Sequence, residues 1–382
     1  MKVKLGEIAT YINGYAFKPS DWSDIGRPII RIQDLTGNSY QMNRFNGMCD
    51  SKYIVRNGDV LISWSASLGV YIWQGEEAIL NQHIFKVVFN KVYVNKSFFV
   101  HQVRKILESA STEAHGATMK HLTKPVFDAL PFYLPPIDEQ KRIAYLLDKV
   151  CGIIEGREQQ IQKMDELVKA RFVEMFGEPE SNPFGWEKVN MAAVVRGRAS
   201  NGFFAKREEY VEDGNVAILG VAYVVNRMYS QVEGLPRTNA SDANTRKYKV
   251  EYGDMLFCRS SLVAEGIGKA SIVPEGTPEN TLFECHVIRL PLDLGKCIPE
   301  YMQVLTATEY FRKQMIAQSK TATMTTIGQD GIMNATIILP PIEKQREFYS
   351  FVKRVVKSKL SIQASLDQLE TLKQSLMQKY FG

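Results

Sequence analysis

The stretch of sequence that decides the fold occurs twice. Residues 118–150 read TMKHLTKPVFDALPFYLPPIDEQKRIAYLLDKV, and residues 323–355 read TMTTIGQDGIMNATIILPPIEKQREFYSFVKRV. The two copies align without a gap, so that Gln140 aligns with Gln345 and the Leu-Pro-Pro-Ile at 134–137 aligns with that at 339–342. Self-similarity at this distance indicates a duplicated chain.

The same register continues to the ends of both copies, where the Met-Phe-Gly at 175–177 matches the Tyr-Phe-Gly at 380–382. Upstream the match needs gaps: GDVLI at 58–62 resembles GDMLF at 253–257, NQHIFKV resembles ECHVIRL around His83 and His286, and Lys2-Val3 resembles Lys188-Val189. Each copy therefore has a variable first part and a better-kept last part. We predict a first variable domain over 1–136, a helical segment over 137–180, a second variable domain over 181–341 and a second helical segment over 342–382.

The variable domains have the pattern of mixed α and β structure. Short β-branched or aromatic runs bounded by Gly, Asn or Pro predict strands at Asp59–Ser63, Ile84–Phe89, Val287–Leu290 and Thr336–Leu339. Apolar residues three and four apart predict helices at Tyr93–Ser109 and Pro299–Gln318.

The last part of each copy has the spacing of a coiled coil. Acidic residues follow Pro136 and Pro341 directly, as the dipole of a starting helix favours. The apolar sets then step by four and three: Ile143, Leu147, Val150, Ile154, Ile161, Met164 and Val168 in the first copy, and Phe348, Val352, Val355, Ile362, Leu366, Leu369 and Leu376 in the second. Residues 137–180 hold seven Lys and Arg against ten acids, whereas residues 341–382 hold eight against four.

Opposite charge helps two helices to choose each other. We therefore predict an α+β fold in which two α/β domains are related by a pseudo-twofold axis and separated by two long antiparallel coiled-coil helices. The outer positions Phe172, Leu360 and Leu372 are expected to need partner proteins. A pair of unrelated surface helices is the alternative.

Composition excludes several classes of protein. The chain of 382 residues carries a net charge of +5, and it has neither a signal-peptide pattern nor an apolar run long enough for a membrane span, so we expect it in the cytoplasm. The cysteines are scattered, and Cys285, His286 and Cys297 are too sparse for a zinc site, so no metal is expected.

Catalytic motifs are missing as well. The Pro-Pro pairs follow Leu rather than the Asn or Asp of an amino-methyltransferase loop, and no phosphate-binding loop is present. Asp128 with Glu139-Gln140-Lys141 superficially fits a nuclease, but the acids do not recur in the second copy. We expect a non-catalytic chain without a cofactor of its own. His83 and His286 recur at the same place; we expect a hydrogen-bonded structural role, with base or phosphate contact as the alternative.

Two variable domains, each ending in Leu-Pro-Pro-Ile-x-x-Gln at the start of a long helix, resemble the specificity (S) subunit of Type I restriction–modification systems over essentially the whole chain. GDVLISWSASLG (58–69), LNQHIFKV (80–87) and GATMKHL (116–122) resemble the target-recognition domains of that family. The second copy departs from this pattern, because Arg259-Ser260-Ser261 replaces Trp64-Ser65-Ala66, and the segment 322–326 matches 117–122 less closely.

The resemblance implies a DNA-binding protein. Each target-recognition domain would read one half of an asymmetric bipartite site on double-stranded DNA, and the helices would set the spacing between the halves. The helices would also dock two modification subunits that methylate adenine, with up to two restriction (motor–nuclease) subunits joining them. S-adenosylmethionine, and the ATP and Mg needed for cleavage, would belong to these partners.

Candidate DNA contacts are polar residues in Gly-rich or strand-end loops, since Lys and Arg hold phosphates and polar side chains read base edges. The set is Tyr15, Lys18, Arg31, Gln33, Ser65, Ser67, Thr118 and Lys120 in the first domain, and Arg198, Lys206, Arg227, Arg259, Ser260, Lys320, Thr323 and Thr325 in the second. Two rival classes stay open: a DNA-reading subunit of a related defence or orphan methylation system, and a non-catalytic coiled-coil adaptor without DNA binding.

Overall fold

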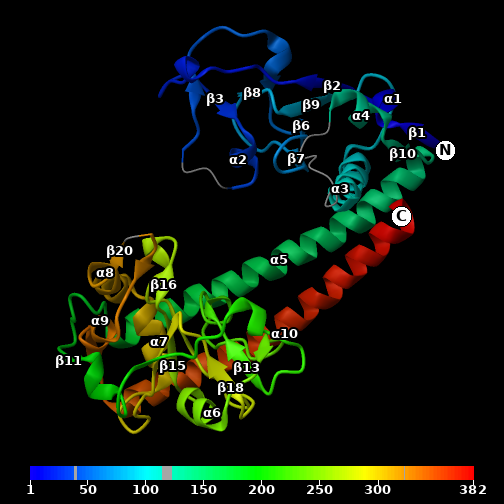
Figure 1. Cartoon of the computed structure of the whole chain (residues 1–382). Coiled ribbons are helices and arrows are strands. Elements are labelled where there is room, and N and C mark those ends of the chain that lie inside the picture. Colours follow the sequence, from blue (N-terminus) through cyan, green and yellow to red (C-terminus); the bar gives the residue numbers. More distant parts are fainter. Residues whose placement is uncertain (38–40, 114–122, 322) are drawn as a thin grey trace. The chain divides into compact units, whose positions relative to one another are not determined.

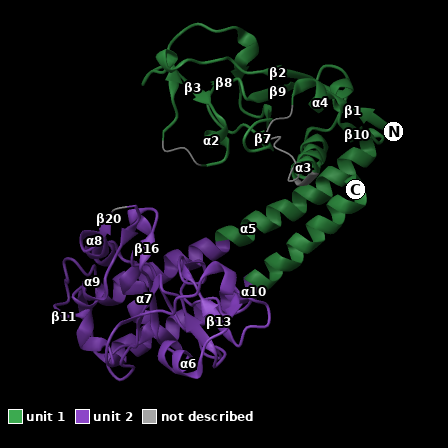
Figure 2. Cartoon of the chain, viewed as in Figure 1, with its two compact units in different colours: residues 1–159, 363–382 green, residues 160–362 purple. Residues whose placement is uncertain are grey.

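The computed structural model in Figure 1 describes residues 1–382 except 38–40, 114–122 and 322. The candidates Thr118 and Lys120 therefore lie outside the described residues. The chain divides into two compact units (Figure 2), namely unit 1 with residues 1–159 and 363–382, and unit 2 with residues 160–362. This division follows packing, so each unit includes part of both long helices. The boundaries of the two variable domains and two helical segments that the repeat predicts stay a prediction.

Unit 1 is built on two four-stranded sheets. Its strands are β1 (Lys2–Lys4), β2 (Thr10–Asn13), β3 (Arg27–Ile30), β4 (Arg44–Phe45), β5 (Ile54–Val55), β6 (Val60–Ser63), β7 (Gly69–Ile72), β8 (Ala78–Leu80), β9 (Ile84–Val88) and β10 (Pro131–Tyr133), and its shorter helices are α1 (Leu5–Ile8), η1 (Pro19–Asp21), α2 (Ile32–Leu35), η2 (Ser51–Tyr53), α3 (Lys96–Glu113) and α4 (Lys124–Ala129). One sheet has the antiparallel order β2-β9-β6-β7. The other has the order β4-β3-β8-β5, with β3 parallel to β8. Strands β1 and β10 pair separately, with Val3 opposite Phe132.

Unit 2 has a corresponding plan. Its strands are β11 (Glu187–Asn190), β12 (Ser200–Asn201), β13 (Val216–Leu219), β14 (Arg237–Thr238), β15 (Met255–Cys258), β16 (Ser260–Ser261), β17 (Ala270–Ile272), β18 (Thr281–Phe283), β19 (Val287–Leu290), β20 (Lys320–Thr321), β21 (Thr325–Thr326) and β22 (Thr336–Leu339), and its shorter helices are η4 (Met191–Val194), η5 (Arg207–Glu209), η6 (Val221–Tyr223), α6 (Asp242–Tyr248), η7 (Ala264–Gly266), α7 (Pro299–Ala307), α8 (Glu309–Ala317) and α9 (Gln329–Met333). The sheet β12-β19-β15-β17 is antiparallel, whereas β13 runs parallel to β18 in β14-β13-β18. Strands β11 and β22 pair with Val189 opposite Ile337.

The two long helices are α5 (Ile137–Phe176) and α10 (Ile342–Phe381). In unit 2 their chain directions oppose, because Lys359 Nζ lies 2.6 Å from Asp165 Oδ1 while Arg171 Nη2 lies 3.6 Å from Glu347 Oε1. In unit 1 the C-terminal end of α10 packs into the core that holds the beginning of α5. Every residue of the two apolar sets listed above is buried or half-buried. Among the described residues, no helix combines the length and apolar character that crossing a bilayer requires.

Aromatic side chains fill the core where each long helix meets its domain. Phe172 and Phe176 of α5 contact Tyr301 and Phe348 in unit 2. Phe172 is only 1% exposed, so the expectation that it lies on an outer face is wrong. The reason is its position on the helix: it lies four residues beyond the buried Val168, on the same face. Leu360 and Leu372 are exposed, as expected.

Two predicted helices differ from those observed. Helix α3 begins at Lys96 rather than Tyr93, because Asn95 Oδ1 accepts a hydrogen bond from the amide of Phe98 and caps the helix. The single helix expected over 299–318 is two helices, since Thr308 is extended at ψ 152° and its hydroxyl caps α8. The strands predicted at 287–290 and 336–339 are β19 and β22 as observed, and those near 60 and 84 agree within one residue.

The repeated Gly-Asp dipeptides form tight turns stabilised by a carboxylate. Gly58 and Gly253 both have positive φ, +86° and +82°, which favours glycine. Asp59 and Asp254 follow them, and each accepts a backbone amide three residues upstream, at 2.9 and 2.7 Å. Each carboxylate also pairs with a cation of the central strand, Lys86 in β9 and Arg289 in β19. This part of the repeat therefore serves the fold.

Candidate nucleic-acid interface

Three loops meet at one end of the antiparallel four-stranded sheet in each unit, which is β2-β9-β6-β7 in unit 1 and β12-β19-β15-β17 in unit 2. We define loop A as residues 13–18 in unit 1 and 201–206 in unit 2, loop B as 81–83 and 284–286, and loop C as 64–67 and 259–262. Loops A and B are joined by the bridges Tyr15↔Asn81 and Phe203↔Glu284. Loops B and C are joined where the amides of Trp64 and Arg259 donate to the carbonyls of His83 and His286, at 3.4 and 2.8 Å.

A glycine in loop A makes this approach possible. A Cβ atom on Gly14 would lie 2.1 Å from the Asn81 carbonyl oxygen, and one on Gly202 would lie 2.3 Å from that of Glu284. Only glycine allows two backbones to come so close. The sequence contains this signal as NGYAFK and NGFFAK, an Asn-Gly-aromatic-x-x-Lys pattern that occurs once in each copy and that was not among the repeated motifs identified above.

Lys18 and Lys206 end loop A at equivalent places. Each precedes a short 3-10 helix, and its backbone amide donates to the acid three residues on, Asp21 at 2.8 Å and Glu209 at 2.6 Å. Both lysines are exposed. The backbone of each is thus fixed while the ammonium group faces solvent, an arrangement that suits phosphate contact.

The remaining candidates of unit 1 are in varied environments. Tyr15 is half-buried among Phe17, Phe45 and Tyr53. Arg31 pairs with Asp34 and donates to the carbonyl of Gln41, so its guanidinium serves the fold. The last three differ in exposure: Gln33 and Ser67 are exposed, whereas Ser65 is buried.

Unit 2 gathers several candidates on the small sheet β16-β21-β20. Ser260 pairs with Thr326, and Lys320 pairs with Thr326 from the other side. Thr325 is buried with its hydroxyl 3.0 Å from that of Thr321, so it supports this sheet. Thr323 and Lys320 are exposed. Arg259 of loop C uses its guanidinium to bond the carbonyl of Cys285 at 3.2 Å.

Two arginines lie apart from this cluster. Arg227 lines a separate pocket with Asp165 and Lys359 of the long helices, and its guanidinium bonds Gln231 and the carbonyls of Val225 and Ala222. Arg198 is exposed just before β12. Both were predicted as DNA contacts, and among the described residues neither pairs with the strands of the sheet that holds Ser260.

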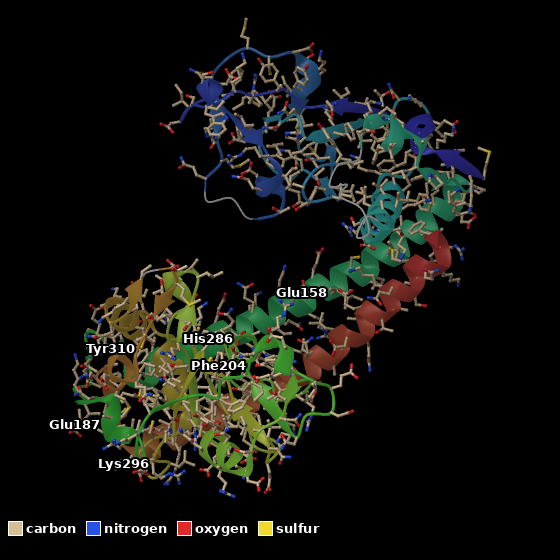
Figure 3. All side chains as sticks on the ribbon, in the orientation of Figure 1. Glu158, Glu187, Phe204, His286, Lys296 and Tyr310 are labelled. Carbon is tan, nitrogen blue, oxygen red and sulfur yellow. The ribbon has the colours of Figure 1, made fainter. Side chains whose placement is uncertain are left out.

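A pocket of about 390 Å³ opens beside loops B and C of unit 2. We call it the Glu284 pocket; its lining residues are Tyr210, Ile218, Gly220, Val221, Ala222, Tyr223, Pro236, Ser260, Ser261, Leu262, Glu284, His286 and Met324. Burial, together with the Glu284 carboxylate, raises the pKa of Tyr210. Figure 3 labels His286 and Phe204 of loop A on unit 2, and both side chains are exposed.

The two repeated histidines are both exposed. His286 is exposed, and its side chain has no hydrogen-bond partner among the described residues. His83 is exposed and meets only its neighbour Gln82, at 3.3 Å, besides a ring contact with Trp64. The hydrogen-bonded structural role expected for this pair is therefore wrong for His286, whereas His83 keeps one hydrogen bond to its exposed neighbour. Among the described residues, His101 is buried, and it bonds Asp148.

Consecutive residues of loop B bring three metal-binding groups together. Ligand atoms of Glu284, Cys285 and His286 lie within 4.8 Å of one another. A structural zinc site has four protein ligands, and Cys297 is fully buried in the core of unit 2 rather than part of this group. The expectation of no metal stays a prediction.

Comparison with known proteins assigns the class. Residues 1–163 match the family model of the Type I restriction modification DNA specificity domain. The EcoBI specificity subunit of Escherichia coli is 25% identical over all of this chain and 85% of its own length, and the MjaVIII specificity subunit of Methanocaldococcus jannaschii is 21% identical over 88% and 81%. The crystal structure of an S subunit from M. genitalium shares the fold, with a TM-score of 0.54 over all of this chain and 96% of that one at 12% identity.

The class is thus that of proteins with a DNA specificity domain. Residues 1–163 contain this domain, and the chain is similar over its whole length to the specificity subunits of Type I restriction enzymes.

Proposed function

We propose that this chain is the DNA sequence-specificity subunit of a Type I restriction–modification complex, in which each variable domain reads one half of an asymmetric bipartite site on double-stranded DNA. One observation carries the proposal: loops A, B and C occur in both units on corresponding strands but carry different side chains. Asn81 corresponds to Glu284, and Trp64 corresponds to Arg259. Two domains that recognise different DNA sequences require the same backbone framework with different polar side chains.

The proposal extends to the helices. The two variable domains are related by a pseudo-twofold axis, and the antiparallel pair α5 and α10 separates them and sets the spacing between half-sites. The exposed Leu360 and Leu372 belong to the surface that docks two modification subunits. Those subunits bind S-adenosylmethionine and methylate adenine, and up to two restriction subunits add ATP- and Mg-dependent cleavage. The chain itself performs no catalysis and works in the cytoplasm.

Sequencing that detects methylated adenine tests the proposal, with genomic DNA compared from cells with and without this gene. We expect methylation to disappear at one asymmetric, gapped motif. If no motif changes although chain and partners are expressed, the proposal fails and the adaptor alternative takes its place. The adaptor also predicts no DNA affinity for the complex, whereas phosphate binding weakens steeply as salt rises.

A further inference from the structure

The Glu284 pocket differs from the surface around it in charge. Its lining holds one carboxylate, one imidazole and several hydroxyl groups but neither lysine nor arginine. Two exposed candidates for phosphate contact, Lys206 and Lys320, lie on loop A and on β20. An acidic pocket repels phosphate. We therefore expect the DNA phosphates to contact these two lysines and a neutral group of the DNA to enter the pocket.

Glu284 is held firmly at its backbone. It follows β18, which runs parallel to β13, and its amide donates to the carbonyl of Leu219 at 3.0 Å. The amide of Cys285 donates to the carbonyl of Phe203 at 2.9 Å. The residue therefore lies between the sheet and loop A with little freedom of its main chain.

The side chain of Glu284 is an acceptor in need of a donor. Its carboxylate has no hydrogen bond or ion pair among the described residues. Gly220 makes room for it, because a Cβ atom there would lie 2.6 Å from Glu284 Oε2. Gly220 has φ −89°, a backbone conformation open to any residue, so its backbone does not require glycine.

In the major groove, only cytosine N4 and adenine N6 offer hydrogens, whereas guanine and thymine offer acceptors that a carboxylate repels. Resting on the proposed function, we propose that Glu284 accepts a hydrogen bond from the exocyclic amino group of a cytosine or adenine and thereby determines one base pair of the half-site read by the second variable domain. Asn81 stands at this place in unit 1, and its amide both donates and accepts, so the two domains differ in preference here.

The test uses the complex of the full chain with its modification subunits and duplexes in which each base pair of the mapped motif is replaced in turn. Glu284→Gln adds a donor, so we expect discrimination to fall roughly 10- to 100-fold at one base pair of one half-site, with the other positions unchanged. Glu279→Gln, an exposed acid of the same unit that does not line the pocket, should leave the whole profile as in wild type.

Gly220→Ala supplies a second variant, because its methyl group displaces the carboxylate while Glu284 remains. It should weaken discrimination at the same base pair. The inference is overturned if both folded variants keep the wild-type profile at every position. If the wild-type complex itself shows no sequence preference, the proposed function has failed rather than this inference.

Discussion

Gln345 accepts a hydrogen bond from the backbone amide of Ile298 at 2.9 Å through Oε1, and its Nε2 donates to the carbonyl of Pro340 at 2.8 Å. Gln140 does the same in unit 1, where Oε1 accepts from the amide of Asn95 at 2.9 Å and Nε2 donates to the carbonyl of Pro135 at 2.8 Å. Each glutamine thus ties the start of a long helix to the segment that begins a domain helix, α3 or α7. This explains why the glutamine of the Leu-Pro-Pro-Ile motif recurs.

Replacing Gln345 with alanine should therefore destabilise unit 2. The change leaves a partly buried backbone amide and a buried carbonyl without partners, and we expect the free energy of unfolding in urea to fall by about 1–3 kcal/mol. Gln374→Ala on the exposed side of α10 is the matched control and should change it by less than about 0.5 kcal/mol. Equal effects of the two substitutions would show that the tie does not stabilise the domain.

The exposed lysines of loop A should act on DNA affinity rather than on sequence preference. We expect Lys18→Ala and Lys206→Ala to weaken binding of the complex on every sequence and to lower the slope of log K against log salt by about one each. Lys296, which lies well apart from His286 in Figure 3, serves as the control. A Lys206→Ala complex with an unchanged salt slope would exclude a phosphate contact there.

The sequence predicted the long helices and the repeated segments well, because a gapless repeat indicates equivalent positions in the two copies and a heptad spacing is typical of paired helices. It could not predict which candidates gather in space. Arg31 and Thr325 looked like surface contacts, yet an ion pair to Asp34 and a buried position on β21 use them for the fold. Glu284 was not selected, because its role depends on Gly220, and the pairing of β13 with β18 that brings them together is not visible from spacing.

The pair His101 and Asp148 should make unit 1 sensitive to acid. Burial lowers the pKa of His101 below its ordinary 6.5, more than the neighbouring Asp148 raises it. Because the unfolded chain then takes up the proton more readily, the contribution is complete above pH 6.5 and is lost as the pH falls through the lower folded pKa. Thermal unfolding in acid and at neutral pH should show a larger loss for wild type than for His101→Gln. Parallel losses would contradict this assignment.

Glu300 shows the opposite dependence. Burial is the main cause that raises the pKa of this carboxyl group, which accepts a hydrogen bond from the hydroxyl of Tyr229 at 2.8 Å. A raised folded pKa gives stability that is complete below the unfolded value and is lost as the pH rises through the folded one. Glu300→Gln keeps an acceptor for Tyr229 without the buried charge, so it should stabilise unit 2 at pH 8 and much less in acid. A destabilised variant at pH 8 would show that the charge itself is needed.

The helices should determine the gap in the DNA site. In unit 1, burial raises the pKa of the Cys151 thiol and the nearby charge of Lys373 opposes that rise, so these two residues lie close together. In unit 2, Asp165 pairs with Lys359, so 14 residues separate the two pairs on each helix. Deleting residues 155–161 from α5 and 363–369 from α10 removes one heptad from each and keeps both contacts. A heptad is about 10 Å of helix, or about three base pairs of duplex. Methylated-adenine sequencing should thus find the same half-sites with a gap about three base pairs shorter, as the helical rise requires.

Deleting the heptad from α5 alone should abolish specific methylation, because the contacts of the two helices no longer match. An unchanged gap in the double deletion would show that the helices do not measure the site.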